Sequence, residues 1–136
     1  MSPCDKSADA APSVTSGINP DNYYGCALDL EPDDRRHPTF QQQRRDRGFD
    51  DTDTWCLRSA ILRFTLPRLK RFKEVQCGYP MEMTAEQWDA DLAEMIFGIE
   101  TFLADEYWES PEMEAIKARM NAGLKLFHDR FYDLWW

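Results

Sequence analysis

The run Gly48-Phe49-Asp50-Asp51-Thr52-Asp53-Thr54-Trp55 sets the architecture of this chain, because it places a helix start directly before a long amphipathic segment. Asp51 or Thr52 can offer a side-chain oxygen to the unpaired N–H groups of a first helical turn, and the neighbouring carboxylates suit the positive end of the helix dipole. Apolar residues then recur at helical spacing as far as Phe72. The sequence therefore predicts a first helix over residues 51–75.

Pro67 interrupts this helix. A proline within a helix lacks the N–H that would bond the carbonyl four residues earlier, here that of Arg63, and its ring crowds the same carbonyl. We therefore expect a kink at Pro67, or two helices that meet at Thr65-Leu66. Gly78 and Pro80 follow, as is typical after a helix C-terminus.

Two further helices are predicted over residues 84–107 and 111–134. The second helix, 84–107, begins at a capping box, Thr84-Ala85-Glu86-Gln87. The third helix, 111–134, begins at Ser110-Pro111-Glu112, which joins a capping serine to a proline suited to the first helical position. Each carries one apolar stripe, and two helices joined by a short turn should pack antiparallel. No strand is predicted. The expected fold is therefore all-α, a small helical bundle of about three main helices with a Pro-kinked first helix.

The N-terminal part differs in composition. Residues 1–47 are predicted to be an extended or partly disordered arm with an Arg-rich linker over 35–47, which could include a short helix. Residues 48–136 are predicted to form the bundle domain. No apolar run approaches the ~20 residues of a membrane-spanning helix, so no membrane partner is expected.

Catalytic and metal-binding patterns are missing from the sequence. No Ser/His/Asp or Cys/His arrangement and no phosphate-binding glycine loop is found, so no catalytic residue is predicted and the chain is expected not to be an enzyme. The four cysteines are far apart and only two histidines are present, so neither a metal nor another cofactor is expected. Reduced thiols in a cytoplasm are the simpler expectation for the cysteines.

Charge is segregated along the chain. Residues 58–73 contain six basic residues and no acid, whereas residues 76–114 contain eleven acidic residues and no base. One interpretation is that the two blocks neutralise each other within the fold. The other is that the acidic face binds a basic groove on a partner, as a nucleic-acid backbone would. Candidate partner-binding carboxylates on this face are Asp89, Glu94 and Glu100.

Aromatic residues outside the apolar stripes are the other candidates. Tryptophan and tyrosine outside a core are favoured interface anchors, unless the N-terminal arm covers them. The candidates are Phe97 and Trp108, expected on one face of the second long helix, and Tyr132 and Trp136 on the third.

The alternative function is nucleic-acid binding through the basic segment 35–73. Basic clusters interleaved with aromatic residues can hold phosphates and stack bases. The candidate contacts are Arg68, Lys70, Arg71 and Lys73. The net charge of −9 opposes this alternative, because it would repel a polyanion.

The run Gly48–Leu57 together with Leu66-Pro67-Arg68-Leu69-Lys70-Arg71-Phe72-Lys73-Glu74 resembles a group of small uncharacterised tailed-bacteriophage proteins. These share a Gly-Phe/Trp-Ser/Asp-Asp-x-x-Thr-Trp-x-Leu motif followed by Leu-Pro-Arg-Leu-Lys-Arg-Phe-Lys-Glu. The resemblance continues in three segments and covers about residues 48–136: Met83–Asp89, Asn121–Phe127 and Phe131–Trp136.

This resemblance implies a setting and no reaction. It points to a viral accessory protein made in the cytoplasm of the bacterial host. Together with the absence of a catalytic pattern, it leads us to expect a non-enzymatic protein that binds a host or defence-system macromolecule as an inhibitor or adaptor. Homo-oligomerisation is left open.

Overall fold

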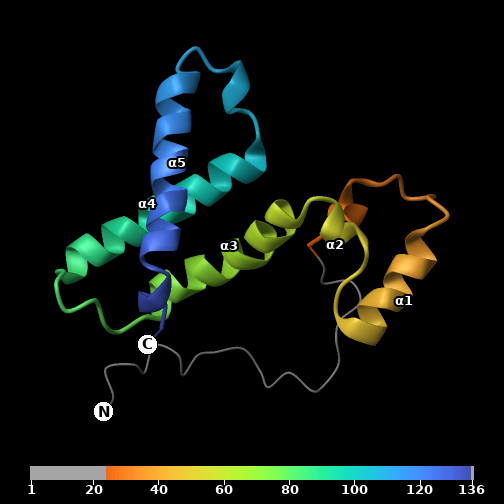
Figure 1. Ribbon diagram of the computed structural model, residues 1–136, viewed down its shortest axis with the longest axis horizontal. Coiled ribbons are helices and arrows are strands. Elements are labelled where there is room, and N and C mark those ends of the chain that lie inside the picture. Colours follow the sequence, from red (N-terminus) through yellow and green to blue (C-terminus); the bar gives the residue numbers. More distant parts are fainter. Residues whose placement is uncertain (1–23, 136) are drawn as a thin grey trace. The chain divides into compact units, whose positions relative to one another are not determined.

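The computed structural model describes residues 24–135, which contain five α-helices, three short 3-10 helices and no strand (Figure 1). The predicted all-α class is confirmed for this part of the chain. The elements are η2 (Cys26–Asp29), α1 (His37–Arg47), α2 (Thr52–Trp55), α3 (Leu57–Val75), α4 (Ala85–Ala104), η3 (Tyr107–Glu109), α5 (Met113–Asp129) and η4 (Phe131–Asp133).

The described residues form two compact units, which meet in sequence between Thr65 and Leu66. We refer to residues 24–65 as the N-terminal unit and to residues 66–135 as the C-terminal unit. The predicted boundary between an arm and a bundle lay at residues 47–48, whereas residues 24–47 belong to the same unit as the run 48–65. Part of the predicted Arg-rich linker is the helix α1, which ends where Gly48 adopts a left-handed conformation with φ of 87°. The rest of the predicted arm, residues 1–23, lies outside the described residues.

The first predicted helix is interrupted at Cys56, whose φ of −137° and ψ of 74° lie outside the helical region. It therefore consists of two helices, α2 and α3. Pro67 lies within α3, and the helix is assigned without interruption on both sides of it. A bend at Pro67 stays a prediction.

The C-terminal unit is organised by α4. The predicted capping box is confirmed: Gln87 N donates to Thr84 Oγ1 at 3.1 Å, and Thr84 N donates to Gln87 Oε1 at 2.9 Å. Trp88, Leu92, Met95 and Ile99 are the largest fully buried apolar side chains of the described chain, and their spacing of three or four residues gives this helix the single apolar stripe that was predicted.

Both long helices end earlier than predicted. The backbone of Asp105 turns into the left-handed region, with φ of 53°, and ends α4 at Ala104 instead of residue 107. Similarly, α5 begins at Met113 and ends at Asp129, and the chain continues into η4. The tail of the predicted third helix is therefore a separate short element, which changes the direction of its aromatic side chains.

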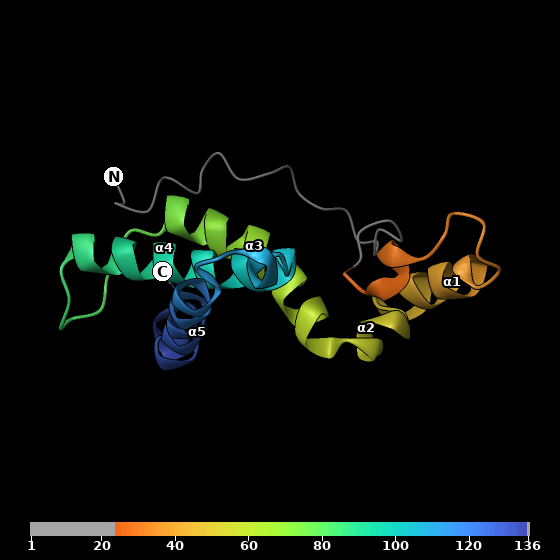
Figure 2. The same cartoon turned by 90° about the horizontal axis from the view of Figure 1, so that it is seen from above.

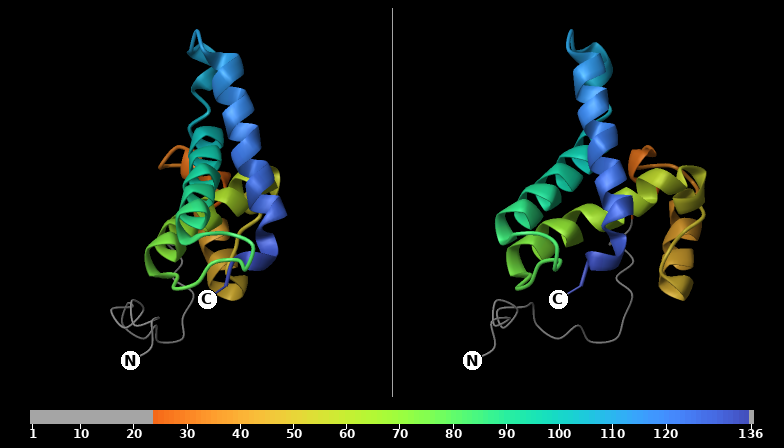
Figure 3. Two further views of the ribbon diagram at one scale, coloured as in Figure 1. Left: turned by 90° about the vertical axis from the view of Figure 1, so that its left-hand side faces the viewer. Right: turned by 60° about the vertical axis from the view of Figure 1, so that its left-hand side comes forward.

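The helices α4 and α5 cross obliquely and pack against each other, as two views show (Figures 1 and 3). Glycines occupy the crossing point. A Cβ atom on Gly98 would lie 2.8 Å from the carbonyl oxygen of Met120, and one on Gly123 would collide with the carbonyl oxygen of Glu94. The two backbones therefore approach closely because neither glycine carries a side chain.

The C-terminal half of α3 runs beside α4 in the same unit (Figure 2). Leu69 and Val75 of this half are buried and add to the core around α4. This unit is therefore a three-helix arrangement in which α4 contacts both neighbours.

We expect Gly123→Ala to lower the stability of the C-terminal unit. Alanine favours a helix over glycine by about 1 kcal/mol, but here the added methyl must push a backbone carbonyl of α4 aside, and overpacking of this kind typically costs about 1–3 kcal/mol. Urea unfolding followed by circular dichroism measures the net change.

Gly78→Ala is the matched control, because nothing lies within 4 Å of a Cβ atom at that position. Its stability should equal or slightly exceed that of the wild type. Equal stability of the Gly123→Ala and Gly78→Ala variants would contradict the close crossing.

Candidate functional site

The three predicted partner-binding carboxylates are each ion-paired within the C-terminal unit. Asp89 lies 3.1 Å from Lys73 Nζ, and Glu100 lies 2.7 Å from Lys70 Nζ, so both pairs join α4 to α3. Glu94 accepts from Arg119 Nη2 and Nε at 2.8 and 3.0 Å, which joins α4 to α5. The structure thus places all three side chains in contacts between helices. The pairs of Asp89 and Glu100 join the acidic block to the basic block, whereas Arg119, the partner of Glu94, lies outside both blocks.

The predicted nucleic-acid contacts are engaged in the same way. Lys70 and Lys73 form the pairs with α4, and Arg71 forms an ion pair with Glu74 at 3.1 Å. Arg68, on the same helix, also has an interaction partner. A phosphate backbone would have to compete with carboxylates for at least three of these four cations.

The four predicted aromatic anchors have different environments. Phe97 is half-buried, and the guanidinium of Arg119 lies 3.7 Å above the centre of its ring. Trp108 does not share a helix with Phe97 as predicted, because α4 ends four residues before it; the indole belongs to η3. Tyr132 is 90% exposed. Trp136 lies outside the described residues.

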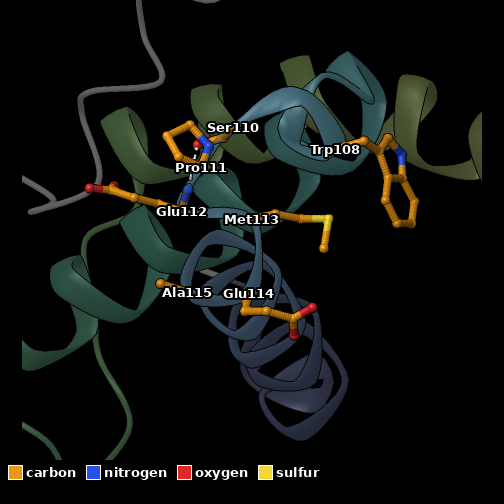
Figure 4. Close-up of a pocket in the computed structure, with 7 residues that line it drawn as sticks. All are labelled: Trp108, Ser110, Pro111, Glu112, Met113, Glu114 and Ala115. Carbon is orange, nitrogen blue, oxygen red and sulfur yellow. Dashed lines mark hydrogen bonds between the residues drawn. The ribbon is translucent and has the colours of Figure 1, made fainter.

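Trp108 forms one wall of a surface hollow of about 440 Å³ between the end of α4 and the start of α5 (Figure 4). The indole is 53% exposed, yet its orientation is held: Nε1 donates to Asp105 Oδ1 at 2.6 Å, and the ring stacks on Tyr107 with centroids 4.4 Å apart. Figure 4 shows Met113 and Glu114 extending toward the side of the hollow on which the indole lies. The hollow is lined by Trp108, Ser110, Pro111, Glu112, Met113, Glu114 and Ala115.

Five carboxylates surround this turn and form no ion pair with another described residue. They contrast with the α4 carboxylates described above, although both groups belong to one acidic block in the sequence. The five are Asp105, Glu106, Glu109, Glu112 and Glu114. Glu86 in the first turn of α4 apart, the carboxylates of the acidic block that form no ion pair with a described residue all lie at this turn, which the sequence pattern did not single out.

A second exposed aromatic group lies at the other end of the unit. Phe131 packs edge-to-face on Phe127 and on Tyr132, with ring centroids 6.1 and 6.3 Å apart, and remains 60% exposed. Trp135 is 78% exposed. Phe131 falls within the predicted third helix, 111–134, but it belongs to η4 because α5 ends at Asp129.

The N-terminal unit contains a buried polar network centred on Asp50, which is fully buried. Asp50 Oδ2 accepts from Arg44 Nη1 at 2.5 Å, and Oδ1 accepts from Thr52 N at 2.7 Å and from the Thr52 hydroxyl. Thr52 Oγ1 in turn accepts from Ala27 N at 2.9 Å. The network ties α1, α2 and η2 together.

This network corrects the predicted helix cap. The side chain that receives an N–H at the start of α2 is that of Asp50, whereas neither Asp51 nor Thr52 caps this helix. The Asp51 carboxylate instead accepts from Arg47 Nη2 at 2.6 Å and from Gln43 Nε2 at 2.8 Å, and these bonds lower the pKa of Asp51. The Arg44 guanidinium compensates the charge of the buried Asp50 carboxylate, as the burial of a charge requires.

Asp53 is less well compensated. Its Oδ2 accepts from Asp50 N at 3.1 Å, but its buried Oδ1 has no hydrogen-bond partner in the described part of the chain. Burial raises the pKa of the Asp53 carboxyl, and the charge of Asp50 raises it further. Gly25 lies against this carboxylate, and a Cβ atom there would collide with it.

The thiols differ from one another. Cys26 and Cys56 are free; burial raises the pKa of Cys26, whereas a hydrogen bond with Ser59 lowers the pKa of Cys56. Cys77 is disulfide-bonded, so the expectation that all four cysteines are reduced is wrong for this residue.

Residues 24–135 contain no group of three or more His, Cys, Asp or Glu side chains arranged to hold a metal ion. None of the helices in that range combines the length and the apolar character needed to span a membrane.

Comparison with protein-family models, with curated proteins and with solved structures finds no match to this chain.

The stability of the protein should depend on pH through Asp53, because its charged carboxylate is buried unfavourably. Because its pKa is raised in the folded state, the folded form binds a proton more tightly than the unfolded form does. The free energy of unfolding of the wild type, relative to an Asp53→Asn variant, should therefore rise as the pH falls from neutral through the raised folded-state pKa, and level off below the ordinary value of 3.8.

Urea unfolding of both proteins over a pH series measures this difference. Asp33→Asn, at an exposed aspartate in the same unit, serves as the control for the loss of one carboxylate. A wild type that loses stability relative to Asp53→Asn on acidification would contradict the unfavourable burial of the Asp53 charge.

Proposed function

We propose that this chain is a bacteriophage accessory protein that works without catalysis, by binding a host or defence-system protein in the bacterial cytoplasm. The observation that carries the proposal is the exposed aromatic group at the end of the C-terminal unit, formed by Phe131, Tyr132 and Trp135. The sequence resemblance to small phage proteins supplies the setting.

Exposure of this group is unfavourable for the isolated protein. A large aromatic side chain removes about 150–250 Å² from water when it is fully buried. Tyr132 and Trp135 are left 90% and 78% exposed, although they are close in sequence and the unit has a well-formed core around α4. Tyrosine and tryptophan also dominate the binding free energy at protein interfaces. A partner that covers this group would bury aromatic surface that the isolated chain leaves in water.

Nucleic-acid binding is supported less well. The cations that were its candidate contacts on α3 are engaged within the C-terminal unit. The full chain also carries a net charge of −9, which repels a polyanion. The exposed aromatic group is as accessible to a second copy of this chain as to another protein. The experiment therefore also measures the oligomeric state.

The test is recovery of a partner from a bacterial host lysate by the tagged full-length protein. A stoichiometric partner should be retained by the wild type and lost by the double variant Tyr132→Ser with Trp135→Ser. Tyr79→Ser is the matched control, because Tyr79 is an exposed tyrosine elsewhere in the same unit and should not affect retention. Thermal unfolding checks that all three proteins remain folded.

Three other outcomes would contradict parts of this proposal. In the first, the wild type retains no partner but sediments as a dimer, while the double variant sediments as a monomer. That result would assign the aromatic group to self-association. Retention unaffected by the double variant would remove the group from the binding surface. Turnover of a nucleotide library by the purified wild type would contradict a non-enzymatic role.

A further inference from the structure

The hollow beside Trp108 combines an apolar wall with a charged rim. The indole face, Pro111 and Met113 supply apolar surface, and the Glu114 carboxylate reaches toward the same side as the indole (Figure 4). The orientation of the ring is fixed in the free protein, because Asp105 accepts from its Nε1 and Tyr107 stacks on it. Preorganisation of this kind reduces the entropy lost on binding.

A long cationic side chain fits this combination. Lysine and arginine have an apolar stem that packs on hydrophobic surface and a charged head that stays near polar groups. A guanidinium also stacks on an indole face and bonds a carboxylate with two parallel N–H groups. A neutral or anionic ligand would leave the carboxylates of the turn uncompensated.

The chain itself places a cation near this ring. Lys117 Nζ lies 5.8 Å from the centre of the Trp108 ring, within the range over which a cation is attracted by the aromatic quadrupole. Lys117 lies on α5 one turn after Met113 and forms no ion pair with another described residue. The indole face therefore attracts a cation already in the free protein.

We propose that the turn at residues 105–115 is a docking surface for a basic protein segment, which inserts an arginine or lysine side chain into the hollow beside Trp108. The five carboxylates without ion pairs among the described residues provide the charge complementarity for the neighbouring residues of that segment. This inference rests on the proposed function as a protein-binding accessory, and it specifies the chemistry of the partner.

The probe is a short, capped peptide in which arginine alternates with glycine, titrated calorimetrically into the full-length protein at near-physiological salt. A peptide with citrulline in place of arginine keeps the shape and removes the charge. The arginine peptide should bind and the citrulline peptide should not. Absence of binding by the arginine peptide, or equal binding of the two, would overturn the proposal.

Variants then separate this site from general attraction by an acidic protein. Trp108→Ala should raise the Kd by about tenfold or more, as for loss of an interface anchor. Glu114→Gln should raise it by about tenfold, as for loss of a charged hydrogen-bond partner. Glu86→Gln removes the same charge from the first turn of α4, as Glu114 occupies the first turn of α5, and should leave the Kd close to that of the wild type.

A gain of affinity provides a further check that misfolding cannot imitate. Lys117→Met removes the internal cation from the indole face and should lower the Kd. Lys125→Met removes an exposed lysine from the same helix, away from the hollow lining, and should change the Kd less. If the two glutamate variants change the Kd equally, and the two lysine variants also change it equally, the peptide binds through the net charge of the protein. That result would overturn the proposed site.

The outcome is separable from that of the proposed function. If the peptide does not bind but a partner is still retained through Tyr132 and Trp135, the docking surface fails and the binding function stands. If the peptide binds at Trp108 but no lysate partner is retained, the docking surface stands and the aromatic group at η4 loses its role.

Discussion

The close approach of α4 and α5 at Gly98 and Gly123 is the constraint on which the C-terminal unit depends. Because the backbones nearly touch there, side chains on either side of the crossing meet across a short distance. Arg119 reaches both Glu94 and the ring of Phe97 from this position. At the start of the same helix α5, Met113 and Glu114 line the hollow beside Trp108 (Figure 4).

Charge neutralisation within this unit is uneven, and the unevenness matters for function. Carboxylates along α4 face cations of α3 and α5, so they stabilise helix contacts modestly and attract a partner only weakly. The turn after α4 has no such neighbours among the described residues. An acidic block that is continuous in sequence is thus divided into carboxylates that pair between helices and, Glu86 apart, carboxylates at the turn that have no ion pair among the described residues.

The N-terminal unit is held by a different interaction, the buried pair of Arg44 with Asp50. A buried ion pair is specific because each charge requires the other: removal of one partner alone typically costs about 3–5 kcal/mol. Asp50 also bonds Thr52, whose hydroxyl oxygen accepts the N–H of Ala27, so one carboxylate connects three short elements that have little apolar core of their own. The Asp-rich run that marks a helix start in the sequence is, in the fold, mainly a connection between elements.

The sequence by itself determined the all-α class, the capping box at Thr84 and the buried stripe of α4, since these depend on spacing and on hydrogen bonds between residues close in the chain. Pairing of the basic and acidic blocks was one of two interpretations that it left open. The interruption at Cys56, the early end of α4 at Asp105 and the separation of Trp108 from Phe97 were decided only in the tertiary structure. So was the choice of which carboxylates remain unpaired. Such features depend on contacts between residues far apart in sequence, as when a glycine of α5 must meet a carbonyl of α4, and no local pattern records those distances.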